Sequence, residues 1–263
     1  AGRIGKIKMH TMSLYESGDS TGKASISDML NNKLQNQLND KITLQKLADL
    51  IIRGGWPSNI NTPDDKIGII PKSYIEAVLD KDINDDKKRD KNKMRMLLKS
   101  LARNESTIVN KNTLLRDIEE ISNDKDLIES RITIDDYLDI LSRLHITENQ
   151  EPYSENYRST KRLGKSAKRH FTDPSLACAC LDLTRDKLIN DLKTFGFMFE
   201  ALVERDLRIY IEYLDGKLFH FRDNVSGLEV DSILEFNDGE YAAVEIKLGY
   251  HQVEEAKQSL MNF

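Results

Sequence analysis

The chain has 263 residues and a formal net charge of -5 at pH 7. Because single domains usually run to about 100–200 residues, we expect two or three small domains. Hydrophobic residues make up 39% and charged residues 32%, with a mean hydropathy of -0.54, which predicts a soluble protein. No stretch of the sequence reaches the apolar length of a membrane span. The net charge does not by itself indicate a polyanionic partner, so any basic region has to be local.

The sequence contains two cysteines, Cys178 and Cys180, in the apolar stretch SLACACLDL. A structural zinc site needs four ligands, and the sequence has no second cluster of Cys or His to complete one. We therefore expect both thiols to pack in the core. The amino terminus does not resemble a signal peptide, which makes the cytoplasm the expected location.

Residues 1–25 open with a strand-like alternation and continue into SGDSTGKAS, which resembles a phosphate-binding loop. Such a loop requires Gly, four residues and then Gly-Lys-Ser/Thr. Here three residues separate Gly18 from Gly22, and Ala24 stands where the hydroxyl residue would be. We therefore predict a polar turn that does not bind ATP.

The next region, 26–93, is predicted to be a helical lid or linker. Helical spacing of apolar residues covers about 27–52 and stops at RGGWP, which contains two glycines and a proline. A second helix begins near Pro71. The run NDDKKRDKNK, residues 84–93, mixes both signs of charge without an apolar residue, which is typical of a solvated connector.

The region 94–172 is predicted to be a winged-helix-like domain. Three helical stretches, MRMLLKSLARN, NKNTLLRDIEEI and TIDDYLDILSRLHI, precede a segment that can form a hairpin around Leu163 and Gly164. Winged-helix modules often bind DNA. The third helix would present Asp135, Asp136 and Asp139, whose charges repel phosphates, so we do not expect it to read the major groove.

The predicted hairpin is strongly basic, with cations and no acidic residue between positions 156 and 172. Its cations are Arg158, Lys161, Arg162, Lys165, Lys168 and Arg169. A segment of this kind can bind DNA through its phosphate backbone without reading bases. The alternative that stays open is a solvated loop whose cations pair with the acidic helices.

After Pro174 the pattern changes to mixed helix and strand. One helix is predicted over about 195–210 and another from about 252 to the last residue. The predicted strands between them are KLFHFRD, LEVDSILEFN and YAAVEIKLG. Turn signals separate these strands at the spacing of an antiparallel meander.

Two of these strands carry acids that can converge. Strict alternation places Asp231 opposite Val230 on its strand, and it places Glu245 and Lys247 together on one face of the last strand. If the polar faces align, both carboxylates meet beside Lys247. Two buried carboxylates repel each other, and a Mg²⁺ ion would remove that repulsion, since one or two carboxylates commonly hold it. Lys247 would then orient a water or stabilise charge at phosphorus.

The sequence contains EVD and, after a gap of thirteen residues that follows the aspartate, EIK. This arrangement resembles the D…ExK core of the restriction-endonuclease-like, PD-(D/E)XK, nuclease fold. Val230 replaces the proline of that signature. The resemblance implies that Asp231 and Glu245 are ligands of Mg²⁺ or Mn²⁺ and that Lys247 positions water. It also implies that Glu200, in FMFEALVE, is a supporting catalytic acid.

A longer series of motifs resembles bacterial and archaeal AAA+ type ATPases that carry an uncharacterised C-terminal domain. AGRIGKIKMHTMSLYESGDSTG, RGGWP, TIDDYLDILSRLHI, KRHFTDPSLA and FGFMFEALVERDL occur in that order over nearly the whole chain. The resemblance implies that residues 1–25 are the tail of an ATPase core lying upstream in cis. ATP is then expected only in the full-length protein, and the chain is expected to be cut within its last helix.

The expected fold class is α+β. A mainly helical N-terminal part with the winged-helix-like module precedes a small α/β restriction-endonuclease-like domain with a mixed sheet over 173–263. Two functions remain open for this last region. It is either a metal-dependent phosphodiesterase, that is, a nuclease module, or a catalytically inactive module of the ATPase that binds DNA or protein or regulates the ATPase.

Overall fold

The fold is given by a computed structural model that describes residues 5, 8–31, 33, 42–80, 90–122, 131–156, 158 and 167–263. The helices over these residues are α1 Ile26–Leu30, α2 Leu44–Arg53, α3 Ile69–Val78, α4 Lys91–Arg103, α5 Lys111–Ser122, α6 Arg131–Arg143, α8 Pro174–Cys180, α9 Arg185–Asn190, α10 Leu192–Tyr213 and α11 Val253–Asn262. The strands are β1 Thr147–Pro152, β2 Lys168–Phe171, β3 Lys217–Arg222, β4 Glu229–Glu235 and β5 Tyr241–Val244. Short 3-10 turns lie at Pro57–Asn59 and Tyr250–Gln252.

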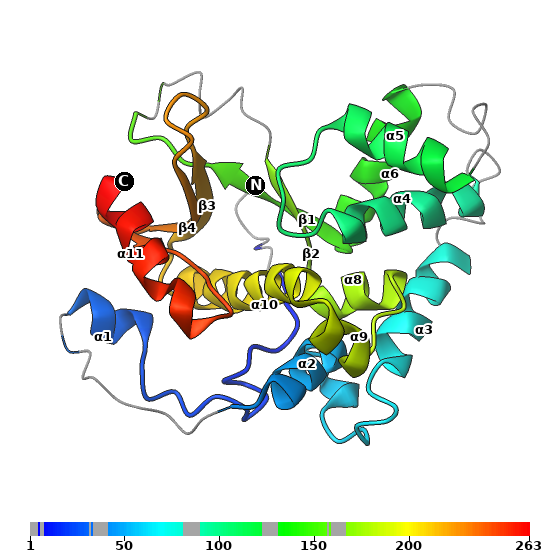
Figure 1. The fold of residues 1–263 in the computed structure, drawn as a ribbon, viewed down its shortest axis with the longest axis horizontal. Helices are drawn as coiled ribbons and strands as arrows, with labels where there is room; N and C mark the ends of the chain where they lie inside the picture. Colours follow the sequence, from blue (N-terminus) through cyan, green and yellow to red (C-terminus); the bar gives the residue numbers. More distant parts are fainter. Residues whose placement is uncertain are drawn as a thin grey trace.

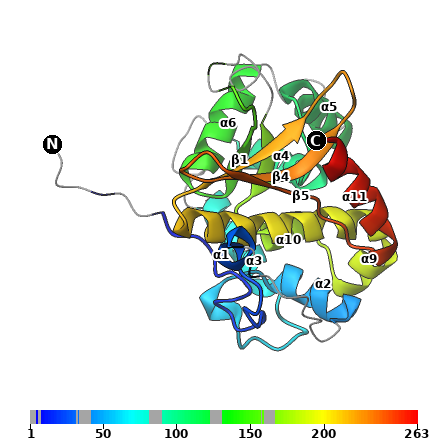
Figure 2. The same cartoon turned by 90° about the vertical axis from the view of Figure 1, so that its left-hand side faces the viewer.

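Helix α10 runs through the middle of the molecule, with the strands on one side and α2 on the other (Figures 1 and 2). The side chain of Asp191 accepts a hydrogen bond from Thr194 N and so caps the start of the helix. Phe195, Met198 and Leu202 recur at helical spacing and are buried in the large core formed with the other helices. Helix α10 therefore joins the helical part of the molecule to the sheet.

The helical core confirms several sequence expectations. The pattern predicted over 27–52 overlaps α1, which begins one residue earlier, and contains α2, which follows the N-cap Thr43, whose side chain accepts from Lys46 N. Cys178 and Cys180 lie on α8 and are buried, as predicted. Burial raises the pKa of the Cys180 thiol to about 12, so this thiol stays protonated.

The N-terminal segment SGDSTGKAS forms a polar turn, as predicted, and contacts the end of α2. Arg53 Nη2 donates to Asp19 Oδ2 at 2.6 Å and to Ser17 Oγ at 3.3 Å. Close by, Met12 N donates to Gly55 O at 2.7 Å, and a Cβ at position 55 would lie 2.1 Å from Met12 O. Only glycine fits there, which explains the second glycine of RGGWP.

The described strands form one mixed sheet in the order β2-β1-β3-β4-β5. β1 pairs antiparallel with β2 and parallel with β3, and β3, β4 and β5 pair antiparallel as the predicted meander. Tyr153 N donates to His220 O at 2.7 Å beside the β1–β3 joint. The sheet thus contains strands from both sides of the boundary predicted at 172/173. The α+β class and mixed sheet are confirmed, whereas the winged-helix and restriction-endonuclease-like assignments stay predictions.

Strand β4 departs from the strict alternation that the sequence predicted. Phe219 pairs with Ile233 but Phe221 pairs with Val230, so an extra residue on β4 forms a β-bulge at Asp231 and Ser232. On the far side of the bulge, each side chain of β4 lies on the opposite face of the sheet from the one that strict alternation predicts. Val230 therefore packs in the same apolar cluster as Ile233 instead of on the opposite face.

The last strand is also shorter than predicted. β5 ends at Val244, and Ile246 N donates at 2.7 Å to the Asp231 carboxylate rather than to a strand carbonyl. Helix α11 covers one face of these strands, where Leu260 and the following Phe263 pack against the apolar cluster that contains Val230 and Ile233. None of the helices in the described ranges has the length and apolar character needed to cross a bilayer.

Candidate functional site

A pocket of about 640 Å³ opens between the start of β4, the end of β5 and α11. It is lined by Ser226, Gly227, Leu228, Glu229, Asp231, Glu245, Lys247, Glu255, Ala256, Ser259 and Asn262. The predicted acids and lysine of the two strands are therefore in one pocket. The lining holds four carboxylates and one ammonium group, so a polyanion entering it without a cation is repelled.

Lys247 binds both predicted acids. Its Nζ donates to Glu245 Oε2 at 2.8 Å and lies 3.5 Å from Asp231 Oδ2. Ser259 Oγ, on α11, donates to Glu245 Oε1 at 2.9 Å. Sequence analysis missed Ser259, because nothing in the pattern of α11 shows which turn faces the pocket.

Burial and charge shift the protonation of this group. Burial raises the pKa of Glu245, with a further increase from the Asp231 carboxylate, although Lys247 acts in the opposite direction. For Lys247 burial acts to lower the pKa, but the hydrogen bond to Glu245 and the charge of Asp231 outweigh it and raise the pKa. Lys247 is therefore an ammonium group at neutral pH.

Glu200, predicted as a supporting acid, lies on α10 outside the lining of the pocket. Lys168 Nζ donates to Glu200 Oε1. Burial raises the pKa of Glu200 to about 8; Lys168 acts against this increase, and the charges of Glu204 and Asp231 add to it. The four predicted catalytic residues thus interact electrostatically, with three of them lining the pocket and Glu200 on α10 outside it.

The donor set of the pocket fits a hydrated divalent cation. Over the described ranges no group of three or more His, Cys, Asp and Glu residues is arranged to hold a metal. Asp231 and Glu245 supply two carboxylates, and the volume leaves room for water and a phosphate group. Mg²⁺ usually keeps several waters and takes one or two carboxylates, so these residues match it.

The described residues of the basic segment lie in different surroundings. Lys168 is 4% exposed and is bound to Glu200 and Glu204, so its ammonium group is not presented to a phosphate. Arg169 is partly buried, and its Nη1 donates to Val109 O at 2.7 Å. Arg158 is exposed. Lys161, Arg162 and Lys165, with the turn at Leu163 and Gly164, lie outside the described residues.

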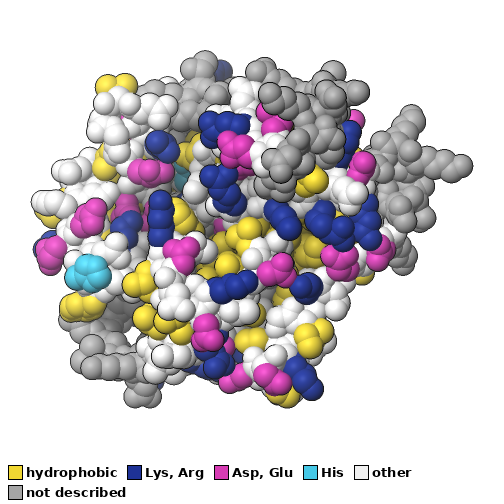
Figure 3. Space-filling model, turned by 45° about the vertical axis from the view of Figure 1, so that its right-hand side comes forward, with side chains coloured by type: hydrophobic (Ala, Val, Ile, Leu, Met, Phe, Trp, Pro, Cys, Tyr) yellow, Lys and Arg dark blue, Asp and Glu magenta, His cyan; other side chains and the backbone are white. Residues whose placement is uncertain are grey.

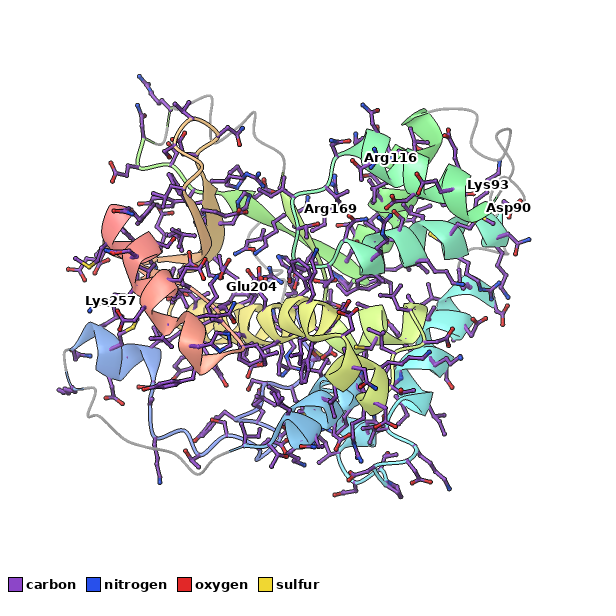
Figure 4. The ribbon with its side chains drawn as sticks, viewed as in Figure 1. Asp90, Lys93, Arg116, Arg169, Glu204 and Lys257 are labelled. Atoms are coloured by element: carbon purple, nitrogen blue, oxygen red, sulfur yellow. The ribbon has the colours of Figure 1, made fainter. Side chains whose placement is uncertain are left out.

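Lys168 is buried because the hairpin presents a polar face to a polar stripe on α10. The stripe consists of Glu200, Glu204 and Arg208, which recur every four residues and so share one side of the helix. Arg208 Nη1 donates to Glu148 on β1, while Glu204 binds Lys168 and lies close to His170 on β2. In Figure 4 Glu204 lies on the side of α10 that faces these strands.

Two family models match the chain. One, described as a domain of unknown function (DUF8612), matches residues 44–187, and the other, also described as a domain of unknown function (DUF4143), matches residues 195–263. The second domain is commonly found in the C-terminal region of AAA-ATPase-like proteins. No curated protein and no solved structure matches the chain. The pocket residues fall within 195–263, whereas β1 and β2 fall within 44–187.

Proposed function

This chain belongs to the family of domains of unknown function DUF8612, and we propose that it is the C-terminal region of an AAA-type ATPase with a phosphodiester-cleaving pocket. The observation that carries the proposal is the convergence of Asp231, Glu245 and Lys247 in one pocket of about 640 Å³. The DUF4143 match supports the association with an AAA-type ATPase.

Each of the four predicted catalytic residues has a defined part in the proposed reaction. Asp231 and Glu245 would hold a Mg²⁺ or Mn²⁺ ion, which when bound would supply a Lewis acid for a phosphoryl oxygen. Lys247, within 3.5 Å of both carboxylates, orients the attacking water or stabilises charge that develops on phosphorus. Glu200 supports them as a buried acid.

The test is cleavage of single- and double-stranded DNA by the chain with Mg²⁺ or Mn²⁺. We expect Asp231→Asn and Lys247→Met to abolish cleavage. Glu240→Gln, in the exposed turn before β5, is the matched acidic control and should leave cleavage unchanged. If the wild-type chain and the complete ATPase leave both DNA forms intact with either cation, the hydrolytic proposal is wrong.

The basic composition of the segment supports a DNA contact through the phosphate backbone. We expect replacement of Lys161, Arg162 and Lys165 by alanine to weaken DNA binding equally for all sequences and to reduce its salt dependence. On the face shown in Figure 3, Lys and Arg side chains have Asp and Glu beside them. Unchanged binding would leave the segment as a solvated loop.

One observation favours the catalytically inactive alternative. Lys247 already pairs with both acids, so the cluster has ion-pair partners without a bound metal. In that case the pocket is part of a DNA- or protein-binding or regulatory module of the ATPase. A Mn²⁺ titration separates the two functions, because binding that disappears in Asp231→Asn supports the hydrolytic site.

A further inference from the structure

A side chain from β1 binds the backbone of β4 at its bulge. Gln150 is fully buried, and its Nε2 donates to Asp231 O at 3.1 Å and to Phe219 O at 2.9 Å. These two carbonyls belong to the strands whose pairing shifts at the bulge. Gln150 therefore binds the backbone of the residue that presents a carboxylate to the pocket.

The orientation of the Gln150 amide is itself fixed. His170 Nε2 lies 3.0 Å from Gln150 Oε1, and His170 Nδ1 lies 3.0 Å from Glu105 Oε1. Burial raises the pKa of Glu105 to about 8, so Glu105 carries a proton at neutral pH and donates it to Nδ1. His170 then donates from Nε2 to Gln150 Oε1. This leaves both N–H bonds of the amide for the two carbonyls.

A second connection runs from the other strand of the hairpin. Lys168, directly opposite Gln150 in the β1–β2 pair, donates to Glu204 Oε1 at 3.0 Å and also binds Glu200. Ser232 Oγ, in the bulge next to Asp231, donates to the same Glu204 oxygen at 3.3 Å. Lys168 thus binds Glu204, the carboxylate on α10 that also accepts the hydrogen bond from Ser232 in the bulge.

We infer that the β1–β2 hairpin positions Asp231 in the pocket, with Gln150 and Lys168 as positioning residues. The pocket itself is lined only by residues of 195–263, and side chains from 44–187 then hold one of its acids, Asp231, in position. The chemical role of the pocket rests on the proposed function, but the positioning itself does not. A buried network that served only as packing would hold the fold without holding this carboxylate.

The amide of Ile246 reports the position of Asp231 directly, because it donates to Asp231 Oδ2 at 2.7 Å. The experiment measures hydrogen exchange at this amide in the full chain, alongside Mn²⁺ affinity and exchange in α4. Gln150→Met removes both donors of the amide, and the loss of two hydrogen bonds should raise exchange at Ile246 by about tenfold. Exchange in α4 should not change, and Mn²⁺ binding should weaken.

The matched control is Asn149→Met, on the same strand but exposed. It should change neither the exchange at Ile246 nor the Mn²⁺ affinity. Unchanged exchange at Ile246 in Gln150→Met overturns the inference. If exchange there rises but the wild-type chain binds no Mn²⁺, the positioning stands and the metal-dependent function fails.

A second variant covers the case in which Gln150→Met does not fold. Lys168→Met combined with Glu204→Gln removes one cation and one anion together, so it leaves the net charge of the network unchanged. This double variant should also raise exchange at Ile246 relative to α4. If exchange at Ile246 stays at the wild-type level, Lys168 is a packing residue and not a positioning residue.

Discussion

Helix α10 packs in two different ways on its two sides. Phe195, Met198 and Leu202 contact the helical core through apolar groups, whereas Glu200 and Glu204 meet the hairpin through buried ion pairs and hydrogen bonds. Apolar burial stabilises without fixing direction. A hydrogen-bonded pair has a required geometry, and a buried ion pair adds little net stability because desolvation offsets its attraction. The apolar side of α10 therefore stabilises the fold, and the polar side fixes how the hairpin lies against the helix.

The largest effect is expected from removing one partner of the polar side. Lys168→Met leaves the carboxylates of Glu200 and Glu204 buried without their cation, which should lower the free energy of unfolding by about 3–5 kcal/mol. Urea unfolding measures this loss. Adding Glu204→Gln should recover part of it. If Lys168→Met alone is as stable as wild type, the ion pairs of Lys168 with Glu200 and Glu204 do not form.

A slightly smaller effect is expected on the apolar side. Met198 is buried between α10 and the helical core, and Met198→Ala should cost about 2–5 kcal/mol by loss of burial and creation of a cavity. Chemical denaturation gives the value. In contrast to the polar variants, exchange at the Ile246 amide relative to other amides should not change. A selective increase there would remove the distinction between the two sides.

The polar side should also respond to pH. The pKa of Glu105 is raised to about 8 in the folded chain from an ordinary 4.5, so the folded state holds a proton that the unfolded state releases. The stabilisation is therefore complete below pH 4.5 and is lost as the pH rises through 8, by up to about 1.4 kcal/mol per pH unit.

Glu105→Gln should make the fall in stability between pH 7 and about 8 shallower. The slope should not vanish, because the pKa of Glu200 is also raised to about 8. His170 acts in the opposite sense, but its lowered pKa places its window below 6.5. Unfolding curves across this range test the expectation, and an unchanged slope in the variant would contradict it.

The smallest effect is expected for an ion pair outside both interfaces. Lys72 and Asp182 lie 2.6 Å apart with most of each side chain exposed. Lys72→Ala should change the free energy of unfolding by at most about 1 kcal/mol, because water screens the pair. A loss as large as that of Lys168→Met would mean that burial is not the property that separates the two ion pairs.

Much of the fold follows from local patterns in the sequence. Helical periodicity predicts α10 and the helices before the hairpin, and the turn signals predict the meander of β3, β4 and β5. The sequence also predicts that Asp231 and Glu245 meet beside Lys247, although in the structure Asp231 lies in a bulge and the other two residues follow the end of β5. These features depend on residues close in sequence or in adjacent strands.

Features that depend on distant packing were not predictable in the same way. The sequence KRHF looks like part of a solvated basic loop, yet Lys168 and His170 are buried because α10, more than thirty residues later, supplies Glu200 and Glu204. The bulge at Asp231 appears in no pattern of β4, since it arises from the register with β3. The sequence around a basic residue in a polar strand does not show that the residue is buried when its acidic partner is far away along the chain.

The parallel joint between β1 and β3 has a consequence for protein engineering. Fusing residues 195–263 to an unrelated partner would leave the backbone amides and carbonyls along β3 without β1. Open strand edges of this kind are templates for association with other chains. Such a chimera should therefore aggregate unless its new partner supplies a replacement strand.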